Sequence, residues 1–241
     1  MNIARVVAGL KQRLLTRSYQ KQDNNIFVLM FHEVTQDTSA VYPSTAISIE
    51  NFVALLDGIA GTDAKFASVD QIHSVKEKTV VITFDDIFQN AYHNAIPVLR
   101  QRNIPYTVFI STEYVDKPGF ITGDMLHQLK EDPLCTIGFH ANSHVMMREM
   151  NDKQIRQAVD PAKFKDTFGV DCRYFAFPYG SVYACPNRAL RIAAKQGFAG
   201  VFSTINSPVN AAQIAKDPWF IPRLNTSDKT YLCVLHKLQG E

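Results

Sequence analysis

Two adjacent aspartates end an apolar run in this chain, in the segment TVVITFDD at residues 79–86. The run predicts a buried strand, because β-branched residues dominate it and nothing polar interrupts Val80 to Ile82. Neighbouring carboxylates raise each other's pKa, and an apolar wall raises both. A cation that binds one carboxylate relieves this cost and leaves the other available as a base. Asp85 and Asp86 therefore predict a metal site with a base beside it.

Two histidines supply the other ligands that such a cation needs. His140 ends a second apolar stretch, residues 134–139, and His144 follows four residues later. Two imidazoles and one carboxylate make a three-ligand site with an open position, which is how hydrolytic zinc sites are built. Alone, the histidine pair is more often surface decoration, and an Asp-Asp pair is more often a strand-end turn. Together, each at the end of a predicted strand, they favour a metal site.

A third segment, FAFPYG at residues 175–180, completes a pattern that resembles the polysaccharide deacetylase family (NodB-homology domain, carbohydrate esterase family 4). The motifs TFDD, H-x-x-x-H and F-x-F-P-Y-G in this order carry the likeness, which covers residues 27–224. It implies an α/β fold, a single-domain distorted (β/α) barrel with seven or eight strands. It also implies a metal-dependent hydrolase that removes N-acetyl groups from an amino-sugar-containing saccharide or glycan intermediate. Zinc suits such ligands best, and other first-row divalent metals bind them as well.

The same resemblance implies roles for individual residues. Asp86, His140 and His144 match the family's metal ligands. Asp85 matches its catalytic base, which takes a proton from the attacking water. The backbone N–H of Tyr179 matches the donor that shares the negative charge developing on the substrate oxygen.

Two positions depart from the family pattern. Ile87 replaces the glycine that usually follows TFDD, and isoleucine would be strained if this position needs a positive φ. Ala176 stands where many members carry an arginine that orients the base. Arg223, at the end of the apolar segment 220–224, is a candidate replacement for that arginine. A structural ion pair is the alternative explanation for Arg223.

The family's late Leu-x-His motif, which supplies the general acid, has no clear match here. The segment LMFHEV at residues 29–34 resembles the start of the branch that includes poly-N-acetylglucosamine deacetylases. In that branch the early histidine is the proposed acid, so we predict this role for His32. His236 lies on a predicted terminal amphipathic helix and is expected at the surface.

Strand and helix patterns alternate along the chain and explain how these residues could meet. Regular alternation implies a parallel sheet with helices outside. In a (β/α) barrel the active site lies at the carboxyl ends of the strands, where the candidate residues fall. The predicted strands are 26–31, 80–85, 106–110, 134–139, 174–177, 201–202 and 220–224, and the predicted helices between them are 48–59, 91–101, 122–130, 151–168 and 187–196.

Composition limits the remaining possibilities. The chain has 241 residues, 46% of them apolar, which suffices for one complete core. No linker or repeat interrupts it, so residues 26–241 are predicted to form the barrel domain after an N-terminal helix and lead-in at 1–25. A formal charge of +2 with both signs interspersed argues against nucleic acid as a partner. Four cysteines without C-x-x-C spacing favour free thiols and a cytoplasmic enzyme.

Residues 1–18 carry basic residues throughout and lack the apolar region of a signal peptide. Apolar residues fall instead at helical spacing from Ile3 to Leu15. The commoner explanation is a helix that packs on the domain or on a partner subunit. The sharper one is an interfacial helix on an anionic membrane, with the enzyme peripheral at the inner membrane face.

Three functions fit these observations. The leading one is a metal-dependent N-deacetylase whose partner is an acetylated saccharide. The second is another C–N amide hydrolase on the same scaffold. The third is a catalytically impaired sugar-binding homologue, which the complete set of metal and base residues argues against and which Ile87 and Ala176 keep open. The sequence predicts neither the oligomeric state nor the identity of the sugar.

Overall fold

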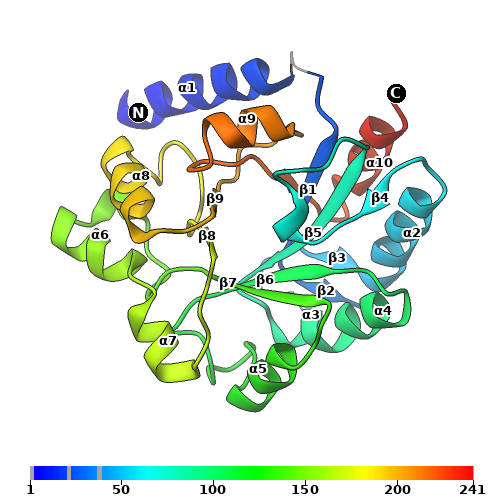
Figure 1. Ribbon diagram of the computed structural model, residues 1–241, viewed down its shortest axis with the longest axis horizontal. Helices are drawn as coiled ribbons and strands as arrows, with labels where there is room; N and C mark the ends of the chain where they lie inside the picture. Colours follow the sequence, from blue (N-terminus) through cyan, green and yellow to red (C-terminus); the bar gives the residue numbers. More distant parts are fainter. Residues whose placement is uncertain (1–2, 21–22, 37–39, 241) are drawn as a thin grey trace.

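A curled parallel sheet surrounded by helices organises the computed structural model of the chain (Figure 1). The structure describes residues 3–20, 23–36 and 40–240. The strands are β1 (Ile26–Phe31), β2 (Val34–Thr35), β3 (Ile47–Ser48), β4 (Lys65–Phe66), β5 (Thr79–Asp85), β6 (Tyr106–Ile110), β7 (Cys135–Phe139), β8 (Tyr174–Ala176), β9 (Gly200–Phe202) and β10 (Leu224–Asn225). The helices are α1 (Ile3–Gln20), α2 (Ile49–Ala60), α3 (Gln89–Asn94), α4 (Ile96–Gln101), α5 (Gly123–Lys130), α6 (Asp152–Val159), α7 (Ala162–Phe168), α8 (Asn187–Ala193), α9 (Ala211–Lys216) and α10 (Tyr231–Gln239).

The strand order round the main sheet is β10-β1-β5-β6-β7-β8-β9, with parallel pairing between neighbours. β4 pairs with Thr79 and Val80 at the start of β5, whereas β6 pairs with β5 from Ile82 onward. Helices cover the outside of this curled sheet (Figure 1). The sheet is the predicted distorted barrel, open enough to be described as a half-barrel.

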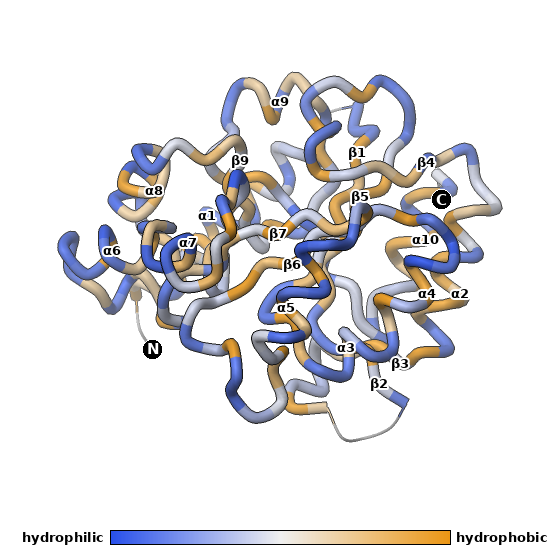
Figure 2. Tube along the Cα trace, turned by 60° about the horizontal axis from the view of Figure 1, so that its bottom comes forward, coloured by the Kyte–Doolittle hydropathy of each residue, from blue (hydrophilic) through white to orange (hydrophobic). Residues whose placement is uncertain are grey.

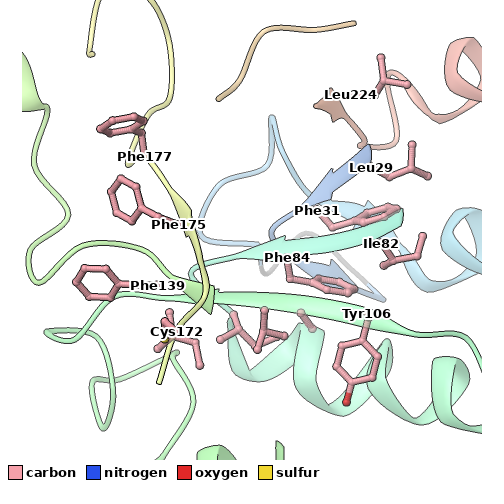
Figure 3. Packing of buried hydrophobic residues seen from close by; sticks show 14 of the residues in the cluster. Leu29, Phe31, Ile82, Phe84, Tyr106, Phe139, Cys172, Phe175, Phe177 and Leu224 are labelled. Atoms are coloured by element: carbon pink, nitrogen blue, oxygen red, sulfur yellow. The ribbon is translucent and has the colours of Figure 1, made fainter. Parts of the chain in front are cut away.

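Alternation along each strand decides which side chains enter the barrel. Leu29 and Ile82 belong to the apolar layer between the sheet and the helices, whereas Val28 and Val81 belong to the layer inside the barrel. Figure 3 shows part of the outer layer, where side chains of neighbouring strands pack together. Figure 2 shows that hydrophobic and hydrophilic stretches alternate along the trace, with hydrophobic colour near β7 and on parts of α2 and α8. Asp85 has the parity of Val81 and therefore enters the barrel.

One segment, residues 221–225, joins the two edges of the curled sheet, and we call it the seam. At its start, Ile221 pairs with Phe202 of β9, and the Ile221 N–H donates to the Val201 carbonyl at 2.8 Å. At its end, Leu224 pairs with Leu29 of β1. The predicted strand 220–224 is therefore wrong in extent, because only Leu224 within it joins the regular strand β10. Arg223 lies between the two ends of the seam.

Two predicted helices are each divided in two. Predicted helix 151–168 becomes α6 and α7, because Asp160 has an extended ψ of 115° ahead of Pro161, whose ring disfavours helical geometry in the residue before it. Asn151 still forms the predicted capping box of α6. Predicted helix 91–101 becomes α3 and α4, with Pro97 in the first turn of α4. Proline lacks the N–H needed to continue the preceding helix.

Helix α1 lies along the outside of the barrel (Figure 1). Its inner face contacts the segment before and at the start of α8: Gln12 Oε1 accepts from the Val182 N–H, and Lys11 Nζ donates to Asn187 Oδ1. The helix extends beyond Leu15, where its predicted apolar pattern ends. None of the described helices is both long and apolar enough to cross a membrane.

The four cysteines are free, as predicted. Cys172 and Cys185 are buried, Cys135 is half-buried and Cys233 is exposed. Burial raises the pKa of the Cys185 thiol above its ordinary value, which keeps it protonated and unreactive.

Candidate metal centre

Asp86, His140 and His144 meet at the carboxyl ends of β5 and β7. One ligand atom from each residue lies within 4.8 Å of the others. His140 Nε2 is 3.7 Å from Asp86 Oδ1, and His144 Nε2 is 3.6 Å from Asp86 Oδ2. Tetrahedral zinc ligands at about 2.1 Å from the ion stand about 3.4 Å from one another, so these separations fit an ion between the three donors. The structure thus brings together the three predicted ligands.

Backbone hydrogen bonds to strand β6 set the positions of Asp86 and His140. It lies between β5 and β7, and its last two carbonyls accept hydrogen bonds from both neighbours. The Asp86 N–H donates to the Phe109 carbonyl at 3.0 Å, and the His140 N–H donates to the Ile110 carbonyl at 2.9 Å. These two backbone hydrogen bonds therefore hold Asp86 and His140 at the same end of the sheet.

The turn after β5 aims the second aspartate at the histidines. Asp86 has a φ of 64° and Ile87 a φ of 35°, so both lie in the left-handed region. The predicted need for a positive φ at Ile87 is met here by a β-branched residue, for which this region is strained. The Ile87 side chain is fully buried in the outer apolar layer, and this burial offsets part of the strain. The same strained turn at Asp86 and Ile87 directs the Asp86 carboxylate toward the two histidines.

A backbone carbonyl orients the first histidine. His140 Nδ1 lies 2.8 Å from the Ala176 carbonyl oxygen, which accepts only if this nitrogen carries the proton. That tautomer leaves Nε2 unprotonated and facing Asp86, as a metal ligand requires. Burial lowers the pKa of His140 to about 3 and also lowers the pKa of His144. Both rings are therefore neutral at physiological pH.

The buried carboxylate of Asp86 fits a metal ligand. Burial, followed by the charge of Asp85, raises the pKa of Asp86 well above its usual range. Its Oδ1 is buried and has no hydrogen-bond partner among the described residues. An unpaired buried carboxylate oxygen facing two imidazole nitrogens fits a divalent metal, which would supply the absent charge.

The neighbouring Asp85 is held by Arg223. Nη1 and Nη2 of Arg223 each donate to one carboxylate oxygen at 2.6 Å, and both side chains are almost completely buried. Arg223 Nε also donates to the Ser203 carbonyl at 3.0 Å. Burial alone would raise the pKa of Asp85, but the charge of Arg223 and its hydrogen bonds hold that pKa well below its ordinary value. Asp85 is therefore a fixed carboxylate.

His32 reaches the same site from β1. The ring is half-buried, and its Nδ1 has no hydrogen-bond partner among the residues described. Burial lowers the pKa of His32, and the charges of Asp85, Arg223 and His144 act on it as well. His32 directly follows β1, whose last residue Phe31 pairs with Phe84 of β5, so His32 stands next to Asp85 at the same end of the sheet. The rival acid, His236, is exposed on α10.

The Tyr179 ring packs against the metal ligand His144. Its φ is 60°, and its backbone N–H has no acceptor within the described part of the chain. Its ring centroid lies 4.7 Å from that of His144, and 48% of the side chain is exposed. The free N–H is available to a substrate oxygen, and the ring is available to a substrate surface.

Three contributors to the site escaped the sequence interpretation. Glu113 accepts a hydrogen bond from the His144 backbone N–H, and the Tyr114 ring lies 5.4 Å from the His144 ring. Both belong to the loop after β6, which carries no periodic pattern. Glu33 is fully buried beside His32. A charged residue inside the apolar run of residues 29–34 was the signal that could have identified it.

Known proteins resemble this chain in sequence. The family model described as polysaccharide deacetylase matches residues 73–201, more than half of the chain. A poly-beta-1,6-N-acetyl-D-glucosamine N-deacetylase of Staphylococcus aureus is 23% identical over 251 aligned residues, covering 91% of this chain and 84% of that protein. The enzyme of the same name from Staphylococcus epidermidis is 23% identical over 216 residues, covering 81% and 73%.

Solved structures show the same fold. IcaB from Ammonifex degensii superposes with a TM-score of 0.73 at 24% sequence identity, covering 90% of this chain and 98% of that one. A de-N-acetylase from Aggregatibacter actinomycetemcomitans gives a TM-score of 0.73 at 18% identity, covering 88% and 99%. The family model includes the metal-site residues, Asp85 and Tyr179, whereas His32 and Arg223 lie outside it. The chain belongs to the polysaccharide deacetylase family and is a hydrolase of that class.

Proposed function

We propose that this protein removes N-acetyl groups from an acetylated hexosamine saccharide, with a divalent metal, preferably zinc, as cofactor. One observation carries the proposal. Asp86, His140 and His144 present three converging ligand atoms, and the carboxylate of Asp85 is held ionised beside them by Arg223. A metal site with an adjacent fixed base is the arrangement that amide hydrolysis needs. The names of the staphylococcal relatives support a hexosamine as the sugar.

Each residue then has a defined task. A divalent metal held by the three ligands supplies Lewis-acid activation of water and of the amide carbonyl. Asp85 accepts a proton from the attacking water. The Tyr179 N–H donates to the carbonyl oxygen as negative charge develops on it. His32 donates a proton to the departing sugar amine, so that acetate and a free amino sugar are the products.

Acetate release provides the test. Protein stripped with a chelator and reloaded with Zn²⁺ is incubated with N-acetylhexosamine oligomers, and free acetate is measured. We expect turnover that the chelator removes and Zn²⁺ restores. Metal-loaded protein that binds these oligomers without releasing acetate would identify a sugar-binding homologue. Release from simple acyl amides but from no saccharide would favour another amide hydrolase.

We also propose that α1 docks this enzyme on an anionic membrane surface. Its exposed apolar residues form one stripe along the helix, and the helix contains basic but no acidic residues. Arg13 and Arg17 are exposed near this stripe, as in helices that lie in a membrane interface. The stripe consists of Ile3, Val6, Val7, Leu10 and Leu14. Residues 1–2 of the predicted membrane-contacting segment lie outside the described residues.

Free thiols and such a helix together support work on the cytoplasmic face of the inner membrane. At that location, a lipid-linked or nucleotide-linked saccharide would be a more accessible substrate than a finished wall polymer. Fractionation of cells that express the protein tests this location, because the enzyme should sediment with inner membranes and be released by high salt.

A further inference from the structure

Glu33 is a buried carboxylate without a cationic partner among the described side chains. It accepts from the Val41 N–H at 2.9 Å, from the Tyr42 N–H at 2.7 Å and from Asn90 Nδ2 at 2.8 Å. Its exposed fraction is 0%. Burying a carboxylate is costly, and three neutral donors are what makes it tolerable here. An apolar residue would fill this space more cheaply if packing were its whole purpose.

The loop at residues 36–46, between β2 and β3, is closed without the Glu33 carboxylate, and we call this loop the excursion. Val34 already pairs with Ile47 in the β2–β3 ladder, and the Ile47 N–H donates to the Glu33 backbone carbonyl at 3.0 Å. Asn94 Nδ2 adds a hydrogen bond to the Val34 carbonyl at 2.8 Å. The base of the excursion is therefore fastened by backbone groups and Asn94. The Glu33 side chain holds a more distant part, the backbone at Val41 and Tyr42.

The Tyr42 ring that this contact positions belongs to a row of aromatic rings that ends at the metal centre. The Tyr42 ring meets the Phe88 ring edge-on at 5.8 Å, and Phe88 stacks on Phe120 at 4.7 Å. Phe120 stacks on Tyr114 at 4.2 Å, and Tyr114 adjoins the metal ligand His144. Contiguous packing therefore fixes one side of Tyr42, while 49% of the side chain stays exposed.

Ring contacts join Tyr42 and Tyr179 through the metal ligand His144. The row that starts at Tyr42 reaches His144 through Tyr114, and the Tyr179 ring contacts His144 directly. Tyr179 and Tyr42 are each about half exposed. The C–H face of a pyranose ring packs well against exposed aromatic rings, and rigid aromatic side chains offer contact area at low entropic cost.

We propose that Glu33 is a positioning residue, which holds Tyr42 where its ring contacts the sugar whose acetyl group lies at the metal centre. The inference rests on the proposed deacetylase function and adds a binding role for Tyr42 to it. Among the described residues, Glu33 hydrogen-bonds to none of the three metal ligands, and its charge is the smallest of the influences on the pKa of the neighbouring His32. Its effect on the reaction passes through the backbone of Val41 and Tyr42.

Glu33→Gln is the decisive variant, because it preserves shape but replaces one acceptor oxygen with an NH₂ group. Both carboxylate oxygens accept from backbone N–H groups, so the new donor must face a donor. We expect KM for an N-acetylhexosamine oligomer to rise about tenfold while kcat stays within about twofold, since ground-state contact is lost and the reacting groups are not. Tyr42→Ala should give the same split.

Two further variants separate positioning from general damage. The double variant Glu33→Gln/Tyr42→Ala should raise KM no further than Tyr42→Ala alone, because both changes remove one contact. Asn94→Ala is the matched control, since it breaks a hydrogen bond at the base of the same excursion. It should lower the melting temperature without changing KM. Additive effects in the double variant, or an equal KM change in Asn94→Ala, would overturn the inference.

Amide hydrogen exchange gives a readout that does not need turnover. In Glu33→Gln the N–H groups of Val41 and Tyr42 should exchange faster, whereas that of Ile47 should keep its protection. Unchanged exchange at residues 41 and 42 means that Glu33 does not hold them, and it overturns the inference whether or not acetate is released. Absence of acetate release by the wild type, with faster exchange in the variant, refutes the proposed function and leaves the positioning contact standing.

Discussion

Arg223 and Asp85 lie 138 residues apart in the chain and meet in a two-pronged hydrogen-bonded ion pair inside the barrel. The guanidinium approaches the carboxylate over the rings of Phe109 and Phe202, at 5.4 and 5.9 Å from their centroids. This geometry fixes both carboxylate oxygens and the side-chain rotation of Asp85. This contact is what the role predicted for Arg223 in place of Ala176 requires, and Arg223→Lys tests that role.

Arg223→Lys should shift the pH dependence of the reaction. Lysine keeps the positive charge but loses the fork that engages both oxygens. Because Arg223 holds the pKa of Asp85 low, its loss should raise that pKa. A base must be ionised, so the acidic limb of kcat/KM should move to higher pH. An unmoved acidic limb in a folded variant would reduce Arg223 to a structural ion pair.

The pair should also be required for stability. Arg223→Met leaves Asp85 buried without a partner, which typically costs about 3–5 kcal/mol. Urea unfolding of the metal-free protein measures this loss. The double variant Arg223→Met/Asp85→Leu removes both charges and should recover most of the stability. No recovery would show that Arg223 stabilises the fold through contacts other than Asp85.

Replacing Asp85 and replacing Asp86 should impair the enzyme in different ways. Asp85→Asn removes the base and should lower kcat by about 10²- to 10⁴-fold with zinc content unchanged. Asp86→Asn removes a ligand and should lower zinc content together with activity. Metal analysis after gel filtration, beside acetate release, separates the two. Equal zinc content in both variants would contradict the assigned roles.

Zinc binding should release a proton in a pH-dependent way. Burial and the charge of Asp85 raise the pKa of Asp86, and the metal binds only its ionised form. Affinity should therefore fall as pH falls below that pKa, with more protons released per zinc at a pH below it than at a pH above it. Calorimetry in buffers of different ionisation enthalpy measures this release. Asp85→Asn removes a like charge and should reduce it.

His32→Ala should depress kcat strongly while zinc content stays normal, because the acid is lost and no ligand is. His236→Ala is the natural control, since this exposed histidine lies on α10. A substrate whose leaving group needs no proton, such as an activated aryl acetate, should be hydrolysed nearly normally by the His32 variant. A strong effect of His236→Ala instead would transfer the acid role to the C-terminal helix.

Helix α1 should lose vesicle binding when its apolar stripe is interrupted. Leu10→Asp/Leu14→Asp places charges on that stripe and should weaken sedimentation with phosphatidylglycerol vesicles, without affecting hydrolysis of a soluble oligomer. Leu232→Asp changes a comparably exposed leucine on α10 and should leave binding intact. If the α1 variant changes the oligomeric state and not vesicle binding, the stripe contacts a second copy of the chain.

Local patterns predicted much of the fold and the metal centre. Strand parity follows from alternation, so Asp85 could be placed inside the barrel, and the two histidines share a predicted strand end. The predicted limits of β1 and β6 agree with the structure because their flanking residues are polar or turn-forming. The break before Pro161 was overlooked in favour of the amphipathic pattern on both sides of it.

Contacts between distant segments could not be predicted in the same way. The seam pairs Ile221 with β9 and Leu224 with β1, and no periodicity encodes that change of partner. The hydrogen bonds of Glu33 depend on a non-periodic excursion whose path sequence does not reveal. Arg223 was a candidate partner for the base, with a structural ion pair as the alternative, and its contact with Asp85 depends on the seam, which sequence does not reveal.

The position of the seam late in the chain has a consequence for biosynthesis. A ribosome delivers the three metal-ligand residues and Asp85 well before it delivers Arg223. Until then the first strands lack the segment that joins the two edges of the sheet, and Asp85 has no counter-charge. A chain synthesised only as far as residue 220 thus lacks the partner of Asp85. The ion pair of Asp85 therefore forms only after the seam has been synthesised.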